Sequence, residues 1–313
     1  MTSPPVVLFI FNRPDTTARV FERIAAYRPE RLLVVADAPR PGRLAEEELC
    51  AEARHVTEHI DWPCHVERKY ATQNLGCRDR IATGVAWAFE RAEEAIFLED
   101  DCLPEASFFS YATELLARYR QDDRIGAISG NTFQPEPFAC AESYYYSRYF
   151  HCWGWASWRR AWTDYDAYLS DWPDRKSKGL VESVFESDTV AANDWCKIFD
   201  DVYEKRIDTW DYQFVYTSWK ADRLTILPRF NLVSNIGFRS DATHTGNALD
   251  PMANFPTKPL GCPLVHPTQV SRNAGADAWS QRRLFSTVPP RARKRRRFRN
   301  LLGKAFHWLT RAG

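Results

Sequence analysis

The chain has 313 residues, of which 44% are hydrophobic and 27% are charged, a composition typical of a soluble globular protein with a buried core. Its start lacks the basic and apolar stretches of a signal peptide, and no run approaches the ~18 apolar residues of a membrane span, so a cytoplasmic protein is expected. The eight cysteines include no Cys-x-x-Cys pair, which argues against a zinc ribbon or a disulfide scaffold and favours reduced thiols.

The net charge of +1 is unevenly distributed along the chain. Residues 289–313 contain nine Lys or Arg residues and no acid, so subtracting them leaves −8 on the rest of the chain. An acidic body argues against a nucleic-acid-binding surface on the fold, and nucleic acid is therefore not an expected partner. Contact with a membrane or another polyanion is expected only at the basic tail.

The first 130 residues alternate between strand and helix patterns. Strands are expected at 6–11, 31–37, 64–69, 95–98 and 125–129, and helices at 14–27, 44–60, 78–91 and 106–119. Such alternation predicts an α/β fold, with a mostly parallel central sheet flanked by helices. In sheets of this kind, ligands bind beyond the carboxyl ends of the strands.

The character of the chain changes after residue 130. The segment 144–162 is rich in aromatic residues, and helical periodicity follows across 176–206 and again from Trp210. From Phe238 to Pro290, proline and polar residues dominate and periodicity fades, which predicts irregular chain. We therefore expect a main domain over 1–246, an irregular segment over 247–288 and a basic amphipathic tail over 289–313.

Three of the expected strands end in polar clusters. Asn12 to Asp15 follow the first strand, Asp37 to Arg40 follow the second, and the segment IFLEDDCLP places Glu99, Asp100 and Asp101 directly after an apolar run. A pair of carboxylates at a strand end suits a hard divalent cation that bridges the protein to a substrate diphosphate. The alternative is an exposed acidic turn that caps the next helix, and the short motif alone leaves both interpretations open.

The absence of several well-known sequence motifs argues against some classes of enzyme. The sequence has no G-x-G-x-x-G after the first strand, no G-x-x-x-x-G-K-[ST], no H-E-x-x-H and no G-x-S-x-G. Dinucleotide oxidoreductases, P-loop enzymes, zincins and serine hydrolases therefore lose their main sequence support. Because no glycine-rich phosphate loop is present, a bound diphosphate would need a metal to neutralise it.

The order of the motifs resembles a bacterial sugar-transferase group of the GT-A type and, more distantly, the N-acetylglucosaminyltransferase I family. The resemblance covers about residues 5–246 and rests on these segments in this order: VLFIFNRPD, LLVVADAPR, NLGCRDRIATGVAWAF, IFLEDDCLPEASFFSY, GWASW, TWDYQF, and NLVSNIGF followed by THT. It implies a GT-A fold for residues 1–246 and metal-dependent transfer of a sugar from a nucleotide-diphosphate donor.

The resemblance implies a donor-binding set. Asp37 would face the base of a uridine nucleotide, with Asn12 and Arg13 nearby, and Arg78 and Asp79 would lie against the nucleotide and its phosphates. The arginine fork suits phosphate oxygens. The alternatives are that Asp37 caps a turn and that Arg78 pairs with a helical acid.

The resemblance also implies a metal centre. Asp101 would bind Mn²⁺ or Mg²⁺ directly, while Glu99 and Asp100 would hold the waters of the metal or the donor sugar and ribose. His244 would return to the metal or the diphosphate, although a histidine in a polar loop is more often a solvated surface residue. Asp241 is an alternative neighbour of the site.

Two further residues concern the acceptor. Asp211 in TWDYQF matches the base that takes a proton from the acceptor hydroxyl. Its alternative is a helix-start acid favoured by the helix dipole, and Asp208 is a local competitor. Trp155, after Gly154, is expected in a loop near the sugars, although aromatic residues at this density usually belong to a core.

The tail is expected to contact membrane. Its apolar residues recur at helical spacing and the remaining positions are basic, as in helices that lie in the interface of an anionic membrane: Phe298, Leu301, Leu302, Ala305, Phe306 and Leu309. The alternatives are a disordered tail or nonspecific RNA binding. With the cytoplasmic expectation above, this predicts peripheral association with the inner face of the plasma membrane.

These observations together favour a metal-dependent glycosyltransferase that moves a sugar from a UDP-sugar donor to a glycan or lipid-linked acceptor, with inversion, in cell-surface polysaccharide assembly. One rival is a sugar-nucleotide nucleotidyltransferase, which would want a Gly-rich, Arg-bearing loop where FNRPD stands. The other is a non-enzymatic, membrane-associated glycan-binding or lytic protein, which would have no need for metal-dependent nucleotide affinity.

Overall fold

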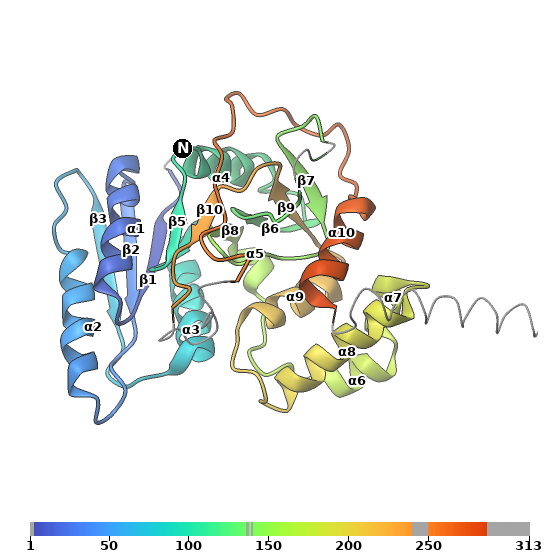
Figure 1. Ribbon diagram of the computed structural model, residues 1–313, viewed down its shortest axis with the longest axis horizontal. Coiled ribbons are helices and arrows are strands. Elements are labelled where there is room, and N and C mark those ends of the chain that lie inside the picture. The colour runs from blue at the N-terminus through green and yellow to red at the C-terminus, as the bar shows by residue number, and fades with distance from the viewer. Residues whose placement is uncertain (1–2, 136–137, 139, 240–249, 287–313) are drawn as a thin grey trace, which may run out of the picture.

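The computed structural model describes residues 3–135, 138, 140–239 and 250–286, which form a central eight-stranded sheet with helices on both faces (Figure 1). The strand order is β3-β2-β1-β4-β8-β6-β9-β7. The strands are β1 (Val6–Ile10), β2 (Arg31–Ala36), β3 (His65–Tyr70), β4 (Glu94–Glu99), β6 (Ile125–Ser129), β7 (Tyr144–Ser147), β8 (Trp155–Trp158) and β9 (Leu224–Pro228). The predicted α/β class, with a central sheet flanked by helices, is confirmed.

The two halves of the sheet differ in strand direction. The strands β3, β2, β1 and β4 are parallel to one another, as the alternating pattern predicts. Beyond β4 the sheet is mixed, because β8 runs antiparallel to both of its neighbours, β4 and β6, whereas β6 and β9 are parallel and β7 and β9 are antiparallel. The aromatic segment thus supplies two strands, and the carboxyl end of β4 lies where the parallel half meets the mixed half.

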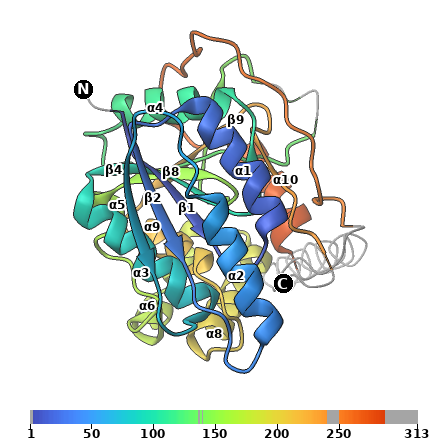
Figure 2. The same ribbon diagram turned by 90° about the vertical axis from the view of Figure 1, so that its left-hand side faces the viewer.

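Helices cover both faces of the sheet. The first four are α1 (Pro14–Tyr27), α2 (Leu44–Val56), α3 (Gly76–Arg91) and α4 (Ser107–Arg118). The others are α5 (Arg159–Trp162), α6 (Trp172–Ser177), α7 (Leu180–Phe185), α8 (Thr189–Tyr203), α9 (Asp211–Lys220) and α10 (Ala274–Ser280). In Figure 2, α1 and α2 lie on one side of the parallel strands and α3 lies on the other. The expected helix over 44–60 ends four residues early, at Val56.

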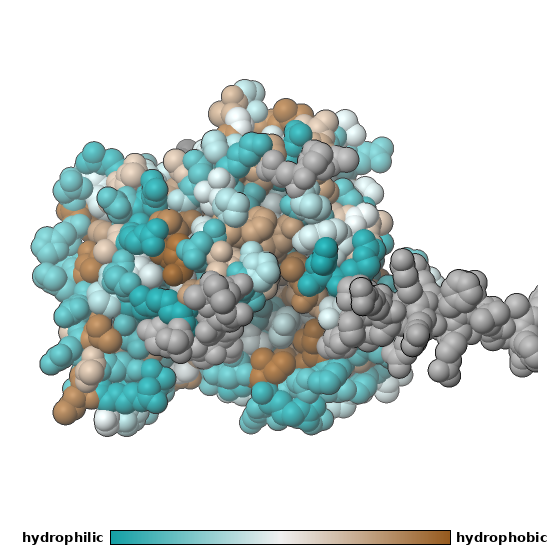
Figure 3. Space-filling view, in the orientation of Figure 1, coloured by the Kyte–Doolittle hydropathy of each residue, from teal (hydrophilic) through white to brown (hydrophobic). Residues whose placement is uncertain are grey.

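The alternation of side chains along each strand divides the core into two clusters. On β1, Val7 and Phe9 pack with α3 and the later helices, whereas Leu8 and Ile10 pack with α1 and α4. Successive strand residues point to opposite faces, so a continuous apolar strand serves both layers. The face of the molecule in Figure 3 is mostly hydrophilic, with hydrophobic side chains in separate patches.

A short antiparallel ribbon holds the chain that follows the acidic triplet. It consists of β5 (Cys102–Pro104) and β10 (Val233–Asn235), with Cys102 opposite Asn235. The backbone N–H of Ile236 donates to the carbonyl of Asp101 at 2.8 Å. Two segments more than 130 positions apart in the chain therefore meet at the triplet.

The C-terminal part of the described chain packs against the mixed half of the sheet. Residues 250–273 contain no helix or strand, but α10 and a π-helical turn (Gln281–Phe285) follow within the segment for which irregular chain is expected. Buried Asp277 accepts a hydrogen bond from the hydroxyl of Ser147, which anchors α10 to β7. The basic tail over 289–313 lies outside the described residues. No helix in the described ranges is both long and apolar enough to cross a membrane.

Candidate functional site

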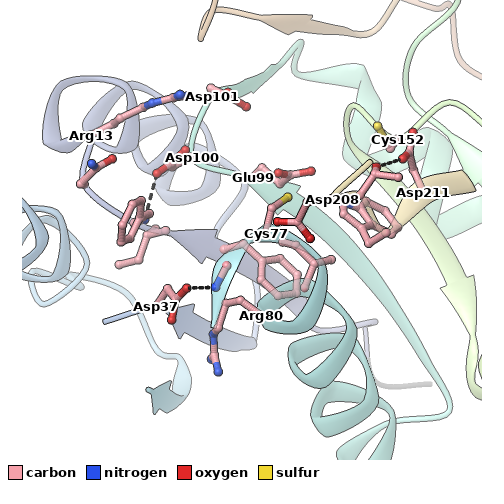
Figure 4. A pocket seen from close by; sticks show the side chains of 18 of the residues that line it. Arg13, Asp37, Cys77, Arg80, Glu99, Asp100, Asp101, Cys152, Asp208 and Asp211 are labelled. Atoms are coloured by element: carbon pink, nitrogen blue, oxygen red, sulfur yellow. Dashed lines mark hydrogen bonds and ion pairs between the residues drawn. The ribbon is translucent and has the colours of Figure 1, made fainter. Parts of the chain in front are cut away.

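A cavity of about 490 Å³ opens at the carboxyl ends of β1, β2 and β4, where the parallel pattern predicts a site. Its volume lies in the usual range for small-molecule sites. Charged residues of both signs line it, and acids outnumber bases among the described residues: Asp37, Glu99, Asp100, Asp101, Asp208 and Asp211 against Arg13, Arg40 and Arg80. Figure 4 shows Arg13 and Asp101 at one side of the view, Asp211 at the other, and Glu99 between them.

The acidic triplet is formed by the end of β4 and the turn that follows. The Asp100 carboxylate accepts the backbone N–H of Phe11 at 3.0 Å, which ties the triplet to the end of β1. Burial, reinforced by the charge of Asp101, raises the pKa of Asp100 to about 7. Burial and then the charges of Asp101, Asp100 and Asp211 raise the pKa of Glu99 well above its ordinary value. The triplet is therefore a place where added positive charge is stabilising.

Asp101 is paired with Arg13. The two side chains, 14% and 13% exposed, meet with Arg13 Nη1 2.8 Å from Asp101 Oδ2. Gly237 closes over the pair, since a Cβ on this residue would lie 2.1 Å from Asp101 Oδ2 and 2.7 Å from Arg13 Nη1. Only glycine allows the backbone to approach this closely. Arg13 thus lies against the acidic triplet, whereas the resemblance implies a place beside the base.

Asp37 lines the cavity, but its carboxylate is occupied by the turn that begins α3. It accepts backbone N–H groups from Ala38, Leu75 and Gly76 at 2.9 to 3.1 Å and a side-chain amide from Asn74 at 3.2 Å. Gly76 has φ +75°, a left-handed conformation that favours glycine. Burial raises the pKa of Asp37, and the backbone donors oppose that rise. Asp37 therefore holds the 74–76 turn, as its alternative interpretation predicts, and its contact with a nucleotide base stays a prediction.

Arg78 and Asp79 are not among the residues that line the cavity. Arg78 pairs with Asp79 at 2.9 Å, and its guanidinium lies 4.6 Å from the ring centre of half-exposed Tyr168. Arg80 lines the cavity instead, with its guanidinium donating to the carbonyl of Lys69 at 2.6 Å. Residues two positions apart in an α-helix are rotated by about 200° around the helix axis. Arg78 and Arg80 of α3 therefore face nearly opposite sides of the helix. The arginine that the resemblance favours is therefore not among the residues of the cavity wall.

Asp211 is the first residue of α9 and also lines the cavity. The hydroxyl of Thr209 donates to its Oδ1. The helix dipole favours an acid at this position, and the charge of Asp211 contributes to the raised pKa of Glu99. The helix-start interpretation is confirmed, and the role as base stays a prediction. Asp208 lines the same side and is exposed.

The prediction for Trp155 is wrong. Trp155 belongs to β8, is only 2% exposed and stacks on Phe97 with ring centres 4.3 Å apart. A side chain buried in the core is not available to an acceptor sugar. Trp153, two positions earlier, is partly exposed and lines the cavity, with its ring edge against Phe133 and Phe238. The density of aromatic residues predicts a core correctly, but not which tryptophan lies outside it.

Asn12 lines the cavity, as the resemblance implies, and its side chain donates to Glu46 at 3.3 Å.

Several other lining residues were not predicted from the sequence. One of them is Arg40, which pairs with the same glutamate. Arg40 stands in the strand-end cluster after β2, and that position was the available signal. Of the others, Asn74, Cys77 and Arg80 stand in NLGCRDR and Asn235 stands in NLVSNIGF, but none of them was given a role, and Cys152 and Trp153 come from the aromatic segment.

A preformed metal centre is not present in the described part of the chain. No group of three or more His, Cys, Asp or Glu residues there is arranged to hold a metal ion. His244, and with it the alternative Asp241, lies outside the described residues. The donor chemistry nevertheless fits Mn²⁺ or Mg²⁺, because hard cations take carboxylate oxygens and are commonly held by one or two carboxylates together with substrate phosphates and water. Asp101 and Glu99 provide such oxygens at the cavity wall.

Comparison with known proteins gives distant likenesses to solved structures only. No model of a known protein family matches the sequence, and no curated protein matches it. Among solved structures, the chain is similar to the mannosyltransferase PcManGT from Pyrobaculum calidifontis, in complex with GDP-Man and Mn²⁺, with a TM-score of 0.41 and 16% identity over 71% of this chain and 70% of that one. A likeness this distant carries no weight for activity, which has to be inferred from the cavity.

Proposed function

We propose that the protein is a GT-A-type, metal-dependent glycosyltransferase that moves a sugar from a nucleotide-diphosphate donor, a UDP-sugar, to a hydroxyl of a glycan or lipid-linked acceptor. The observation that carries the proposal is the cavity at the carboxyl ends of the parallel strands, where Asp100 and Asp101 stand on one side, Asp211 on the other and Glu99 between them. Six carboxylates around one cavity favour a cation-bridged anionic substrate over an anion alone.

Asp101 and Glu99 would hold the divalent cation, Mn²⁺ or Mg²⁺. When bound, the cation offsets the charge that develops on the leaving diphosphate. Asp100 would not need to contact it, because its carboxylate is engaged by the backbone of Phe11 and fixes the turn. Arg13 and Arg80, both at the cavity wall, are the arginines placed to contact phosphate oxygens.

Asp211 would act as the general base. Its carboxylate takes the proton from the acceptor hydroxyl as that oxygen forms a bond to the anomeric carbon, and the bond from this carbon to the diphosphate oxygen breaks with its electron pair. Thr209, which donates to Asp211, holds the carboxylate in place. The proposal assigns one base and no carboxylate nucleophile, which corresponds to direct displacement with inversion.

The first experiment is a calorimetric titration of UDP into the protein with and without Mn²⁺, repeated on Asp101→Ala. We expect binding that requires the metal and is lost in the variant. Binding of GDP in place of UDP, with the same dependence on Asp101, would correct the donor and leave the reaction class standing. Absence of any metal-dependent nucleotide binding would contradict the proposal and favour the glycan-binding rival, although burial of Trp155 removes part of the support for that rival.

The domain organisation and the cellular setting belong to the same proposal. We assign the transferase to residues 1–246 and a membrane-binding role to the tail over 289–313, on the inner face of the plasma membrane, in polysaccharide assembly. The nine basic residues of the tail and its apolar spacing support this. Flotation with anionic liposomes tests it: full-length protein should float, and a chain ending near Val288 should not.

A further inference from the structure

In the part of the chain that the structure describes, Arg13 is the cation that pairs with the acidic triplet. Its guanidinium pairs with Asp101 at 2.8 Å, and its charge also opposes the rise in pKa of Glu99 and Asp100. The other two arginines at the cavity wall do not pair with the triplet. Arg40 pairs with Glu46, and Arg80 donates one N–H group to the carbonyl of Lys69. Among the described residues, Arg13 therefore supplies the counter-charge for all three acids.

The ion pair is held from several sides. The carbonyl of Arg13 accepts the backbone N–H of Thr17 at 2.9 Å and its hydroxyl at 2.7 Å, which fixes the base of the side chain at the start of α1. Gly237 closes over the guanidinium and the carboxylate, and Ile236 binds the carbonyl of Asp101. Both side chains are close to nine-tenths removed from solvent, so the pair is less screened than a surface ion pair.

A divalent cation on Asp101 would meet this guanidinium. In the described residues, the metal would have two carboxylates at most, so the donor phosphates must complete its ligands. Two positive groups on the same carboxylate repel one another, and the pair with Arg13 must loosen before the metal binds. A diphosphate supplies both the missing metal ligands and a new partner for the arginine.

We propose that Arg13 occupies the metal position on Asp101 in the free protein and transfers to the diphosphate when the donor binds, so that metal binding and donor binding depend on each other. This inference rests on the proposed function. It gives Arg13 the role of coupling metal binding to diphosphate binding. The resemblance instead places Arg13 near the base of the nucleotide. Metal without donor should then bind weakly, and the protein should take up the two together.

The test measures Mn²⁺ affinity without nucleotide, by electron paramagnetic resonance of the free ion, in wild type and in Arg13→Met. We expect about tenfold tighter binding in the variant, since a charged hydrogen bond that competes with the metal has been removed. Arg13→Lys, which keeps the charge, should stay close to wild type. Arg19→Met, which removes an exposed charge from the same helix, is the matched control and should also stay close to wild type.

A second measurement follows the coupling. In wild type, saturating UDP should tighten Mn²⁺ binding strongly, and in Arg13→Met the same addition should tighten it at least tenfold less. Circular dichroism and thermal unfolding of each variant establish that the fold is intact. If Arg13→Met unfolds, Arg13→Gln, which also removes the charge but keeps a hydrogen-bonding side chain, replaces it, and the same gain in Mn²⁺ affinity relative to Arg19→Met is expected.

The outcomes separate the inference from the proposed function. Equal or weaker Mn²⁺ binding in Arg13→Met, with metal-dependent UDP binding intact in wild type, overturns the inference alone and makes Arg13 an orienting partner of Asp101. Equal gains in Arg13→Met and Arg19→Met also overturn it, because a general charge effect would explain both. Failure of wild type to bind Mn²⁺ and UDP when both are present removes the proposed function and the inference with it.

Discussion

The acid-lined cavity and the aromatic cluster around Trp155 differ in chemistry but are built on the same elements. The cluster consists of Trp155 and the rings that contact it: Phe97, Phe150, Trp162, Trp210 and Phe214. In the cavity, carboxylates face one another with few cations, whereas in the cluster, rings pack with centres 4 to 6 Å apart. Trp155 joins the two, because it stacks on Phe97, two residues before Glu99, and on Trp210, one residue before Asp211. Rigid apolar packing thus holds the carboxylates in place around the cavity, although their charges repel one another.

The comparison separates residues that react from residues that hold them. An exposed cavity acid such as Asp208 can be exchanged with little effect on the fold, whereas Asp37 and Asp100 also hold turns through hydrogen bonds. An aromatic ring of the cluster cannot be exchanged in this way, because its removal leaves a hole in a packed core. Function and stability should therefore respond to different substitutions, even at neighbouring positions.

The largest effect is expected for Asp211→Asn. If Asp211 is the base, kcat should fall by about 10² to 10⁴, the usual contribution of general base catalysis, while Mn²⁺-dependent UDP binding stays unchanged. Steady-state kinetics and calorimetry on the same preparation check this. Asp208→Asn, three positions earlier on the same side of the cavity, is the matched control and should change kcat far less. Equal losses in the two variants would show a shared electrostatic effect.

The next effect concerns the cluster. Trp155→Ala should lower the free energy of unfolding by about 3 to 5 kcal/mol, since it removes a large side chain that is 2% exposed. Trp153→Ala, at the cavity wall, should cost about 1 kcal/mol and instead change the Michaelis constant for the acceptor. Urea unfolding of both variants sharpens the comparison. Similar losses of stability would mean that Trp153 also belongs to the core.

A pH effect of intermediate size is expected from His151. Its ring lies against Phe133, and burial lowers its pKa to about 4, whereas the unfolded chain keeps the ordinary value near 6.5. Below pH 6.5 the unfolded state binds more protons, so stability is lost as pH falls from 6.5 to 4, by about 3 kcal/mol. The free energy of unfolding measured against pH should fall less steeply in His151→Gln than in wild type. Parallel curves would contradict the assignment.

The smallest effect is expected for Arg78→Ala. Because Arg78 pairs with Asp79 and Tyr168 away from the cavity, UDP affinity should stay within about twofold of wild type and stability within about 0.5 kcal/mol. Arg80→Ala is the informative partner, since Arg80 lines the cavity and is 5% exposed. Calorimetry should show weaker UDP binding only for the Arg80 variant. A larger loss for Arg78 would return it to the donor site.

The early part of the fold was predictable because its signals are local. The strand β6 at 125–129 matches its prediction, and α3 and α4 match within two residues, since apolar runs, helical spacing and breakers lie close together in the chain. The clusters after β1, β2 and β4 meet at one cavity because parallel strands place their carboxyl ends at the same edge.

What the sequence by itself determined is therefore the alternating α/β half, the strand-end acids and the acid at the start of α9. The tertiary structure alone decided that β8 inserts between β4 and β6, which sets Trp155 opposite Phe97 and leaves Trp153 at the cavity. It also decided that Arg80 and not Arg78 faces the site, and that Arg13 lies on Asp101. The physical reason is the separation in sequence of the residues that interact. A strand pattern depends on residues that are neighbours in the chain, whereas the partner of a ring or a charge comes from a segment far away in the chain.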